Sequence, residues 1–236
     1  MSLLHVNYFS KPLGKQSAMY VVLPEGDGPF RVVYELHGYS DDYTIWLRRS
    51  NIERYAEERG LMVVLLDGAT SFYIDSRTEN AAYEAHILES VHFVDRTFHT
   101  LPDAKNRAIG GLSMGGYGCM KLGLKYPELF GSIASHSGAL DLAAMYANPE
   151  DKRLHSLLGA HMPPEEDCFA LSARSGAKPA IYFDCGVDDF LLEQNRKFHA
   201  HLDQLGVPHV YAEHPGNHNW AYWDEHITTA LDFHFA

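Results

Sequence analysis

The chain has 236 residues, of which 46% are hydrophobic and 21% charged, and its formal net charge is -12. This size and composition predict one globular α/β domain over residues 1–236, and they exclude a disordered or fibrous protein. Because an acidic surface repels phosphate backbones and no Lys or Arg cluster is present, we expect no nucleic-acid partner.

Short apolar runs along the chain predict strands. They lie at residues 20–24, 31–36, 61–66, 108–110, 132–135, 180–183 and 207–211. The run at 61–66 is almost wholly apolar, as expected of a strand that is buried on both faces of a parallel sheet. No helical pattern separates the first two runs, so we expect the sheet to begin with antiparallel pairing.

Helical patterns separate the later strands. They lie at residues 50–60, 81–98, 115–125, 190–205 and 220–233, and Ser50 is the expected N-cap of the first. This alternation predicts a mostly parallel central sheet with helices on both faces. Residues 141–176 break the alternation and contain no clear strand. We interpret them as an insertion over the carboxyl ends of the strands, where such sheets bind ligands.

The cysteines and the N-terminal residues indicate the cellular compartment of the protein. Cys119, Cys168 and Cys185 show no regular spacing, which favours reduced thiols over a disulfide framework. Residues 1–8 lack a charged segment followed by a long apolar run, and no stretch approaches the ~18 apolar residues of a membrane span. We therefore expect a cytoplasmic protein with no membrane span.

A G-x-S-x-G motif occupies residues 111–115, between a predicted strand and a predicted helix. In that setting a serine sits on a tight, strained turn, and the flanking glycines allow strand and helix to approach closely. The motif predicts Ser113 as a nucleophile. A serine in an ordinary glycine-rich turn is the alternative.

A serine hydroxyl needs a base, and the base needs an acid that orients it, in the chain order Ser, Asp or Glu, His. Asp188 and Asp189 both follow the strand predicted at 180–183. We favour Asp189, three residues after Gly186, and leave Asp188 as an alternative that would cap the next helix.

The base is expected between the last strand and the last helix. His218 lies there in a Gly-Asn-His-Asn turn, whereas the rival His214 precedes Pro215 and is nearer the strand. The tetrahedral oxyanion also needs donors. We expect them to be the backbone N–H groups of Met114, after the nucleophile, and Tyr39, in the loop that begins at His37.

Metal and cofactor motifs are not evident in the sequence. His199 and His201 lie two apart on a predicted helix, where their side chains diverge, and no Cys and His spacing matches a zinc site. No phosphate-binding loop motif occurs either. We predict no cofactor and no metal.

Several longer motifs together resemble the esterase D-type branch of the α/β-hydrolases, most closely its short, tributyrin-type bacterial esterases. That branch includes S-formylglutathione hydrolases and acetyl-xylan and feruloyl esterases. The motifs lie at residues 35–38, 46–53, 110–117, 185–191 and 215–223. The resemblance implies an α/β-hydrolase fold, with Asp189 as the acid and His218, before a Trp-x-x-Trp run, as the base. It also implies that residues 71–75 line the site.

The motifs and the resemblance lead to one expected function. It is a serine carboxylesterase that cleaves short- to medium-chain acyl esters through an acyl-enzyme, with a small-molecule ester as its partner. The alternatives are an S-formylglutathione hydrolase, whose relatives usually run longer and carry a different oxyanion loop, an acyltransferase, and a non-catalytic binding protein on the same fold. The sequence leaves a homo-oligomer open.

Overall fold

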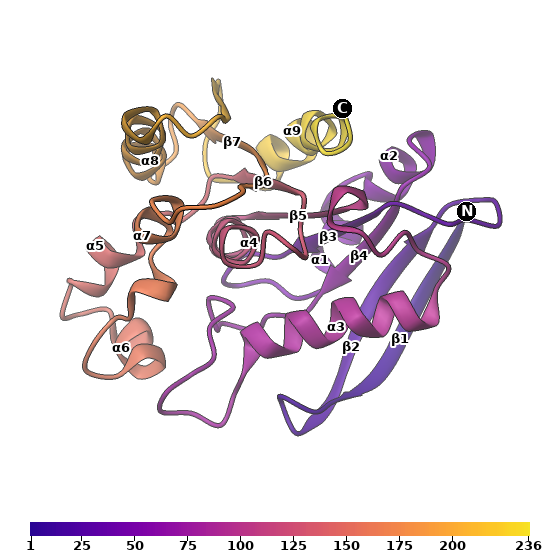
Figure 1. Ribbon diagram of the computed structural model, residues 1–236, viewed down its shortest axis with the longest axis horizontal. Helices are drawn as coiled ribbons and strands as arrows, with labels where there is room; N and C mark the ends of the chain where they lie inside the picture. The colour runs from indigo at the N-terminus through magenta and orange to yellow at the C-terminus, as the bar shows by residue number, and fades with distance from the viewer.

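The computed structural model describes residues 1–236. Its eight strands form one sheet in the order β1-β2-β4-β3-β5-β6-β7-β8 (Figure 1). The strands are β1 (Ser2–Ser10), β2 (Lys15–Leu23), β3 (Val32–Leu36), β4 (Met62–Leu66), β5 (Arg107–Leu112), β6 (Ser132–His136), β7 (Ala180–Gly186) and β8 (Val210–His214).

The sheet begins with antiparallel pairs and continues with parallel ones. β2 is antiparallel to both β1 and β4, and every other neighbouring pair is parallel. The expected antiparallel start is therefore present, although the predicted second strand, β3, lies between β4 and β5 rather than beside β2. The edge strand β1 was not predicted, although Leu4, Val6 and Tyr8 alternate in it with polar residues.

Helices cover both faces of the sheet. They are α1 (Ile45–Arg49), α2 (Ile52–Glu58), α3 (Tyr83–Thr97), α4 (Met114–Lys125), α5 (Leu142–Tyr146), α6 (Lys152–Leu158), α7 (Cys168–Ser172), α8 (Leu192–Leu205) and α9 (Trp220–Phe233), with 3-10 turns at Ala104–Asn106 and Pro164–Glu166. One core packs α3, α4 and α8 against the sheet, and a second core packs α1, α2 and α9 on the opposite face. This arrangement is the predicted α/β-hydrolase fold. None of its helices combines the length and the apolar character needed to cross a bilayer.

The predicted helix at 50–60 starts later than expected, and its predicted N-cap is wrong. Ser50 instead ends the unpredicted helix α1, and its hydroxyl donates to the Trp46 carbonyl at 2.5 Å. Asn51 is the N-cap of α2 and makes no side-chain cap bond. The capping pattern was present in the sequence, but a hydroxyl can equally bond to the carbonyl four residues before it.

The segment between β6 and β7 holds α5, the 3-10 turn at Pro164–Glu166, α6 and α7, which Figure 1 shows gathered at one end of the molecule. A fully buried lysine joins it to the sheet layers: Lys121 Nζ on α4 lies 2.8 Å from Glu166 of this segment and 2.7 Å from Glu84 on α3. Burial alone would raise the pKa of Glu84, but Lys121 outweighs it and lowers that pKa to about 2. Residues 141–176 are thus held against the body of the fold by buried charge pairs as well as by apolar contacts.

Candidate active site

Loops from several strands converge at one edge of the sheet. Because β3, β5, β7 and β8 are parallel, the segments that follow them emerge on the same side. These segments carry Tyr39, Ser113, Asp189 and His218, respectively. The sheet topology therefore brings together residues that lie up to 179 positions apart, from Tyr39 to His218.

Ser113 occupies a strained turn between β5 and α4. Its φ of 56° and ψ of -115° lie in a region of backbone angles that residues other than glycine rarely adopt. The surroundings hold the turn: Ser113 N–H donates to the His136 carbonyl at 2.9 Å, and its own carbonyl accepts from Tyr117 and Ala139. Phe72 and Ser137, which lie around the same site, also have positive φ. Backbone strain is therefore concentrated where the predicted nucleophile stands.

The two flanking glycines of the motif are required by close approach. A Cβ at Gly111 would lie 2.5 Å from the Gly115 carbonyl oxygen, and one at Gly115 would lie 2.4 Å from the Leu36 carbonyl oxygen. Both distances are too short for any side chain. The glycines thus let β5, α4 and β3 pack tightly enough to hold Ser113 on its turn.

Ser113, His218 and Asp189 form a continuous hydrogen-bonded chain. His218 Nε2 lies 3.0 Å from Ser113 Oγ, and His218 Nδ1 lies 2.8 Å from Asp189 Oδ2. A carboxylate only accepts, so the Nδ1 proton donates to Asp189 and leaves Nε2 free to accept from the serine hydroxyl. The His218 ring is also packed edge-on against Trp223, at 4.9 Å between ring centroids.

The two rival residues lie outside this chain of bonds. Asp188 is exposed, and the N-cap position of α8 is Leu191, so the expected capping role for Asp188 is wrong. Instead, Asp189 Oδ1 accepts from the Leu191 N–H at 2.8 Å. His214 ends β8 and stacks on His226 at 4.2 Å between ring centroids. Of the four candidates, the structure joins only Asp189 and His218 to Ser113.

The surroundings of Asp189 keep it ionised. Burial alone would raise its pKa, but hydrogen bonds from His218, from the Leu191 N–H and from Ser137 outweigh burial and hold that pKa below its ordinary value. Ser137 follows β6 at the same sheet edge, and its hydroxyl oxygen also accepts from Trp223 Nε1 at 3.3 Å. Sequence reasoning missed Ser137, although its place directly after a predicted parallel strand was a usable signal.

Two backbone N–H groups near Ser113 make no hydrogen bond within the chain. Neither Met114 N–H, at the start of α4, nor Tyr39 N–H, in the loop after β3, donates to a protein acceptor. The Met114 sulfur is engaged instead, since it accepts from the Phe72 N–H at 3.3 Å. Two free donors beside a serine hydroxyl are what an oxyanion requires.

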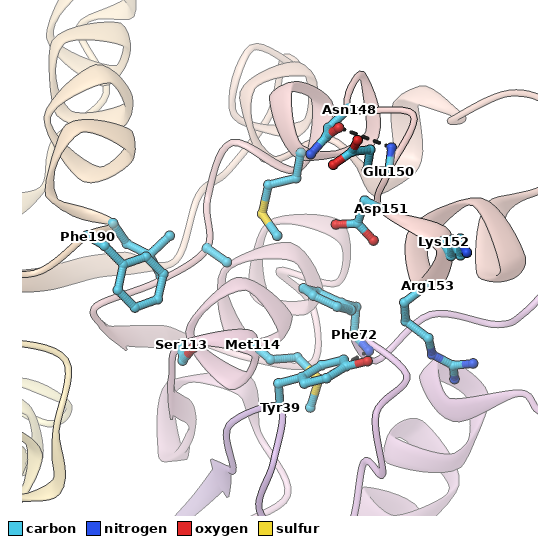
Figure 2. A pocket seen from close by; sticks show the side chains of 13 residues that line it. Tyr39, Phe72, Ser113, Met114, Asn148, Glu150, Asp151, Lys152, Arg153 and Phe190 are labelled. Atoms are coloured by element: carbon cyan, nitrogen blue, oxygen red, sulfur yellow. Dashed lines mark hydrogen bonds between the residues drawn. The ribbon is translucent and has the colours of Figure 1, made fainter.

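A cavity of about 560 Å³ opens on one side of Ser113. Figure 2 shows Tyr39, Phe72 and Met114 on one side of it and residues of the 141–176 segment on the other. Near Ser113 its lining is apolar. Its far wall is polar and consists of Asn148, Glu150, Asp151, Lys152 and Arg153. Phe72 lies within the 71–75 stretch that the resemblance places in the site.

A second cavity, of about 480 Å³, lies on the other side of Ser113 and includes His218. Its wall carries Asp41 and Arg49 together with Trp220 and Trp223. Burial raises the pKa of the Asp41 carboxyl. Phe190, which is 75% exposed and lies 4.5 Å from the His218 ring, lines both cavities. Sequence reasoning did not single out Phe190 as a site residue.

Solved structures similar to this one include bacterial hydrolases. FphF, a fluorophosphonate-binding serine hydrolase of Staphylococcus aureus, superposes with a TM-score of 0.93 and 28% identity over 100% of this chain and 98% of that one. The S-formylglutathione hydrolase FrmB of the same organism superposes with a TM-score of 0.90 and 28% identity over 100% and 99%. The fold and these likenesses define the class as a serine hydrolase of the α/β-hydrolase fold.

Sequence comparison then gives the family. The Esterase family model matches residues 10–234, so the chain belongs to the Esterase family and is an ester-hydrolysing enzyme. An acetyl esterase of Caldicellulosiruptor saccharolyticus is 30% identical over 260 residues, which cover 99% of this chain and 98% of that protein. The predicted serine esterase class is therefore confirmed, and a non-catalytic binding protein no longer competes with it.

Proposed function

We propose that Ser113, His218 and Asp189 are the catalytic triad of a carboxylesterase that hydrolyses esters with short to medium acyl groups. The observation that carries the proposal is the chain of hydrogen bonds from Ser113 Oγ through His218 to Asp189, at 3.0 and 2.8 Å. Both distances lie within the reach that proton transfer requires.

The triad geometry supports a two-step reaction. As Ser113 Oγ bonds to the ester carbonyl carbon, its proton passes to His218 Nε2, and Asp189 stabilises the resulting imidazolium. The carbon–oxygen bond to the alcohol then breaks, and the alcohol leaves with the proton from Nε2. In the second step His218 takes a proton from water, and the hydroxide attacks the acyl-enzyme. Release of the carboxylic acid returns the proton to Ser113.

The oxyanion of each tetrahedral intermediate needs preorganised donors. The free N–H groups of Met114 and Tyr39 fill this role, since both lie next to Ser113 and neither has a partner in the chain. Removal of one such donor typically costs about 10²–10³ in rate. Because both act through the backbone, their side chains are free to shape the cavities.

The two cavities divide the substrate between them. The alcohol must lie on the side of His218, because this residue protonates it, so the 480 Å³ cavity receives the leaving group. The 560 Å³ cavity then receives the acyl group, and part of the 141–176 segment forms its roof. The change from an apolar lining near Ser113 to a polar far wall supports short and medium acyl chains over long ones, because a long apolar chain would meet charged groups.

The test is turnover of p-nitrophenyl acetate, butyrate, octanoate and palmitate by the wild-type enzyme and by Ser113→Ala. We expect turnover of the shorter esters, a fall from octanoate to palmitate, and loss of activity in the variant. A fluorophosphonate probe should label Ser113 in the wild type, as peptide mass mapping would show. Labelling at another serine, or full activity of Ser113→Ala, would overturn the assignment.

Thioester cleavage is the second candidate. The likeness to S-formylglutathione hydrolase FrmB favours it, and that chain matches this one over 99% of its length, so the expectation that such relatives run longer does not hold there. The same triad serves both substrates. If kcat/KM for S-formylglutathione exceeds that for every oxygen ester by tenfold or more, thioester hydrolysis replaces oxygen-ester hydrolysis as the proposed activity.

A further inference from the structure

Three metal-ligating side chains meet where the last turns of α8 run beside the start of β8, apart from the site described above. His199 and Asp203 lie one turn apart on α8, and His209 immediately precedes β8. His199 Nδ1 is 2.7 Å from His209 Nε2, and Asp203 carboxylate oxygens lie 3.5 Å from His199 Nε2 and 3.9 Å from His209 Nε2. One ligand atom from each residue lies within 4.8 Å of the others.

The hydrogen bonds around His209 determine which of its nitrogens is free. His209 Nδ1 lies 2.8 Å from the Val207 carbonyl oxygen, which can only accept, so Nδ1 carries a proton and neutral His209 presents an unprotonated Nε2. A histidine whose other nitrogen donates to a backbone carbonyl is in the tautomer and orientation that metal ligands adopt. His209 is therefore already arranged as a ligand.

Two neutral histidines do not satisfy this cluster. If the single proton of His199 is on Nδ1, it donates to His209 and leaves the Nε2 lone pair facing the Asp203 carboxylate. If the proton is on Nε2, the lone pairs of His199 Nδ1 and His209 Nε2 face each other at 2.7 Å. In either tautomer of His199, the lone pair of its unprotonated nitrogen points at another hydrogen-bond acceptor. A cation bound by the lone pairs of His199 Nδ1 and His209 Nε2 removes this conflict, because His199 Nε2 then carries the proton and faces Asp203 Oδ2, which leaves Asp203 Oδ1 for the ion.

We propose that His199, Asp203 and His209 bind one Zn²⁺ ion. Two imidazoles and a carboxylate are the ligand set that zinc accepts, whereas Ca²⁺ and Mg²⁺ prefer oxygen ligands alone. Zinc bonds of about 2.0–2.1 Å in tetrahedral geometry separate two nitrogens by roughly 3.4 Å, so the rings must part by roughly 0.7 Å. The His199 side chain is 38% exposed and has room for this movement. The fourth position is open to water.

The neighbouring residues hold the rings without competing for the ion. His199 stacks on Tyr211 at 4.7 Å between ring centroids, and His209 stacks on Phe183 at 5.7 Å. The nearby Glu213 carboxylate is already paired with Arg196. The site joins α8 to β8 at the end remote from Asp189 and His218, so bound zinc clamps the two elements together and takes no part in the ester chemistry.

The proposed zinc site departs from the sequence prediction of no metal. Along the sequence, His199 and His201 diverge on their helix, and His201 indeed turns away to the Phe169 carbonyl, 3.1 Å from its Nε2. The third ligand, His209, is ten residues from His199 and reaches the site only because the chain reverses direction at Gly206, the left-handed C-cap of α8.

The experiment is titration of EDTA-treated enzyme with Zn²⁺ by calorimetry, with thermal melting alongside. We expect one ion per chain and, at a free zinc concentration 100 times the Kd, a rise in Tm of roughly 5–10 °C. His199→Ala and His209→Ala should each weaken binding at least tenfold. The matched control His201→Ala, on the same helix, should bind zinc as the wild type does.

Circular dichroism establishes whether each variant is folded. If His209→Ala does not fold, His199→Ala still tests the proposal, because the His199 side chain is 38% exposed. Co²⁺ should give the intense visible absorption of a tetrahedral site in the wild type and lose it in His199→Ala. Equal zinc binding by wild type and both ligand variants would overturn the proposal. The proposal would also be overturned if the wild type bound no zinc.

Discussion

Glu35 gives the sharpest test of how this fold tolerates a buried carboxyl group. It lies on β3, is fully buried, and neither of its carboxyl oxygens has a hydrogen-bond partner. The carboxyl group fills the space over Gly110, where a Cβ would come within 2.4 Å of it. Burial, opposed only partly by the nearby His136, raises the pKa of Glu35 from 4.5 to about 8.

The perturbation is Glu35→Gln, which keeps the shape of the side chain and removes its titratable carboxyl group. In wild type between pH 4.5 and 8, folding takes up a proton, because the unfolded carboxylate is ionised and the buried one is protonated. The stability due to this proton is complete below pH 4.5 and is lost as the pH rises through 8. A tenfold change in proton affinity is worth about 1.4 kcal/mol, so wild type should lose about 3–4 kcal/mol relative to Glu35→Gln between pH 5 and 8.

The assay is urea unfolding of both proteins at intervals from pH 5 to 8, analysed as free energies of unfolding. The comparison cancels every group that titrates alike in the two proteins. Glu128→Gln, at an exposed carboxylate in no ion pair, is the matched control and should follow wild type. If the wild-type and Glu35→Gln curves stay parallel within about 0.5 kcal/mol, the burial argument for Glu35 is wrong.

Three further predictions concern the triad, the acyl cavity and the buried lysine. Asp189→Asn should lower kcat by about 10⁴, because His218 loses its orienting carboxylate, whereas the exposed Asp188→Asn should keep wild-type kcat; equal losses in steady-state assays would contradict this assignment. Met145→Trp should reduce kcat/KM for the octanoyl ester by about tenfold or more and spare the acetyl ester, since Met145 lines the acyl cavity; uniform loss would count against the cavity assignment. Lys121→Met should lower the free energy of unfolding by about 3–5 kcal/mol, because Glu84 and Glu166 lose the buried lysine between them and keep only Lys125 as a cationic partner, at 2.6 and 4.0 Å. The control Lys197→Met removes an exposed pair and should cost at most about 1 kcal/mol, so similar losses in urea unfolding would refute the argument.

Local signals in the sequence were sufficient for the elements around the proposed nucleophile. The strand–glycine–serine–glycine–helix order predicted the ends of β5 within two residues and the ends of α4 within one, because the turn between them is defined within a few residues. The final helix was predicted with its observed bounds, since a helical pattern is a local feature. The prediction that Ser50 caps α2 was wrong, although it also used a local pattern. The Ser50 hydroxyl can bond either to the start of the following helix or to the Trp46 carbonyl, and the pattern does not distinguish the two.

The sequence by itself determined the fold class and predicted the nucleophile position and the order Ser, Asp, His, because each depends on periodicity, turn chemistry and short motifs. Only the tertiary structure decided which aspartate meets His218, that residues of the 141–176 segment line the cavity beside Ser113, and that His209 meets His199 and Asp203. It also decided that Glu35 is buried without a partner. These outcomes depend on contacts between segments far apart in the chain, and such contacts are set by the packing of the whole sheet and its helices, which no local pattern records.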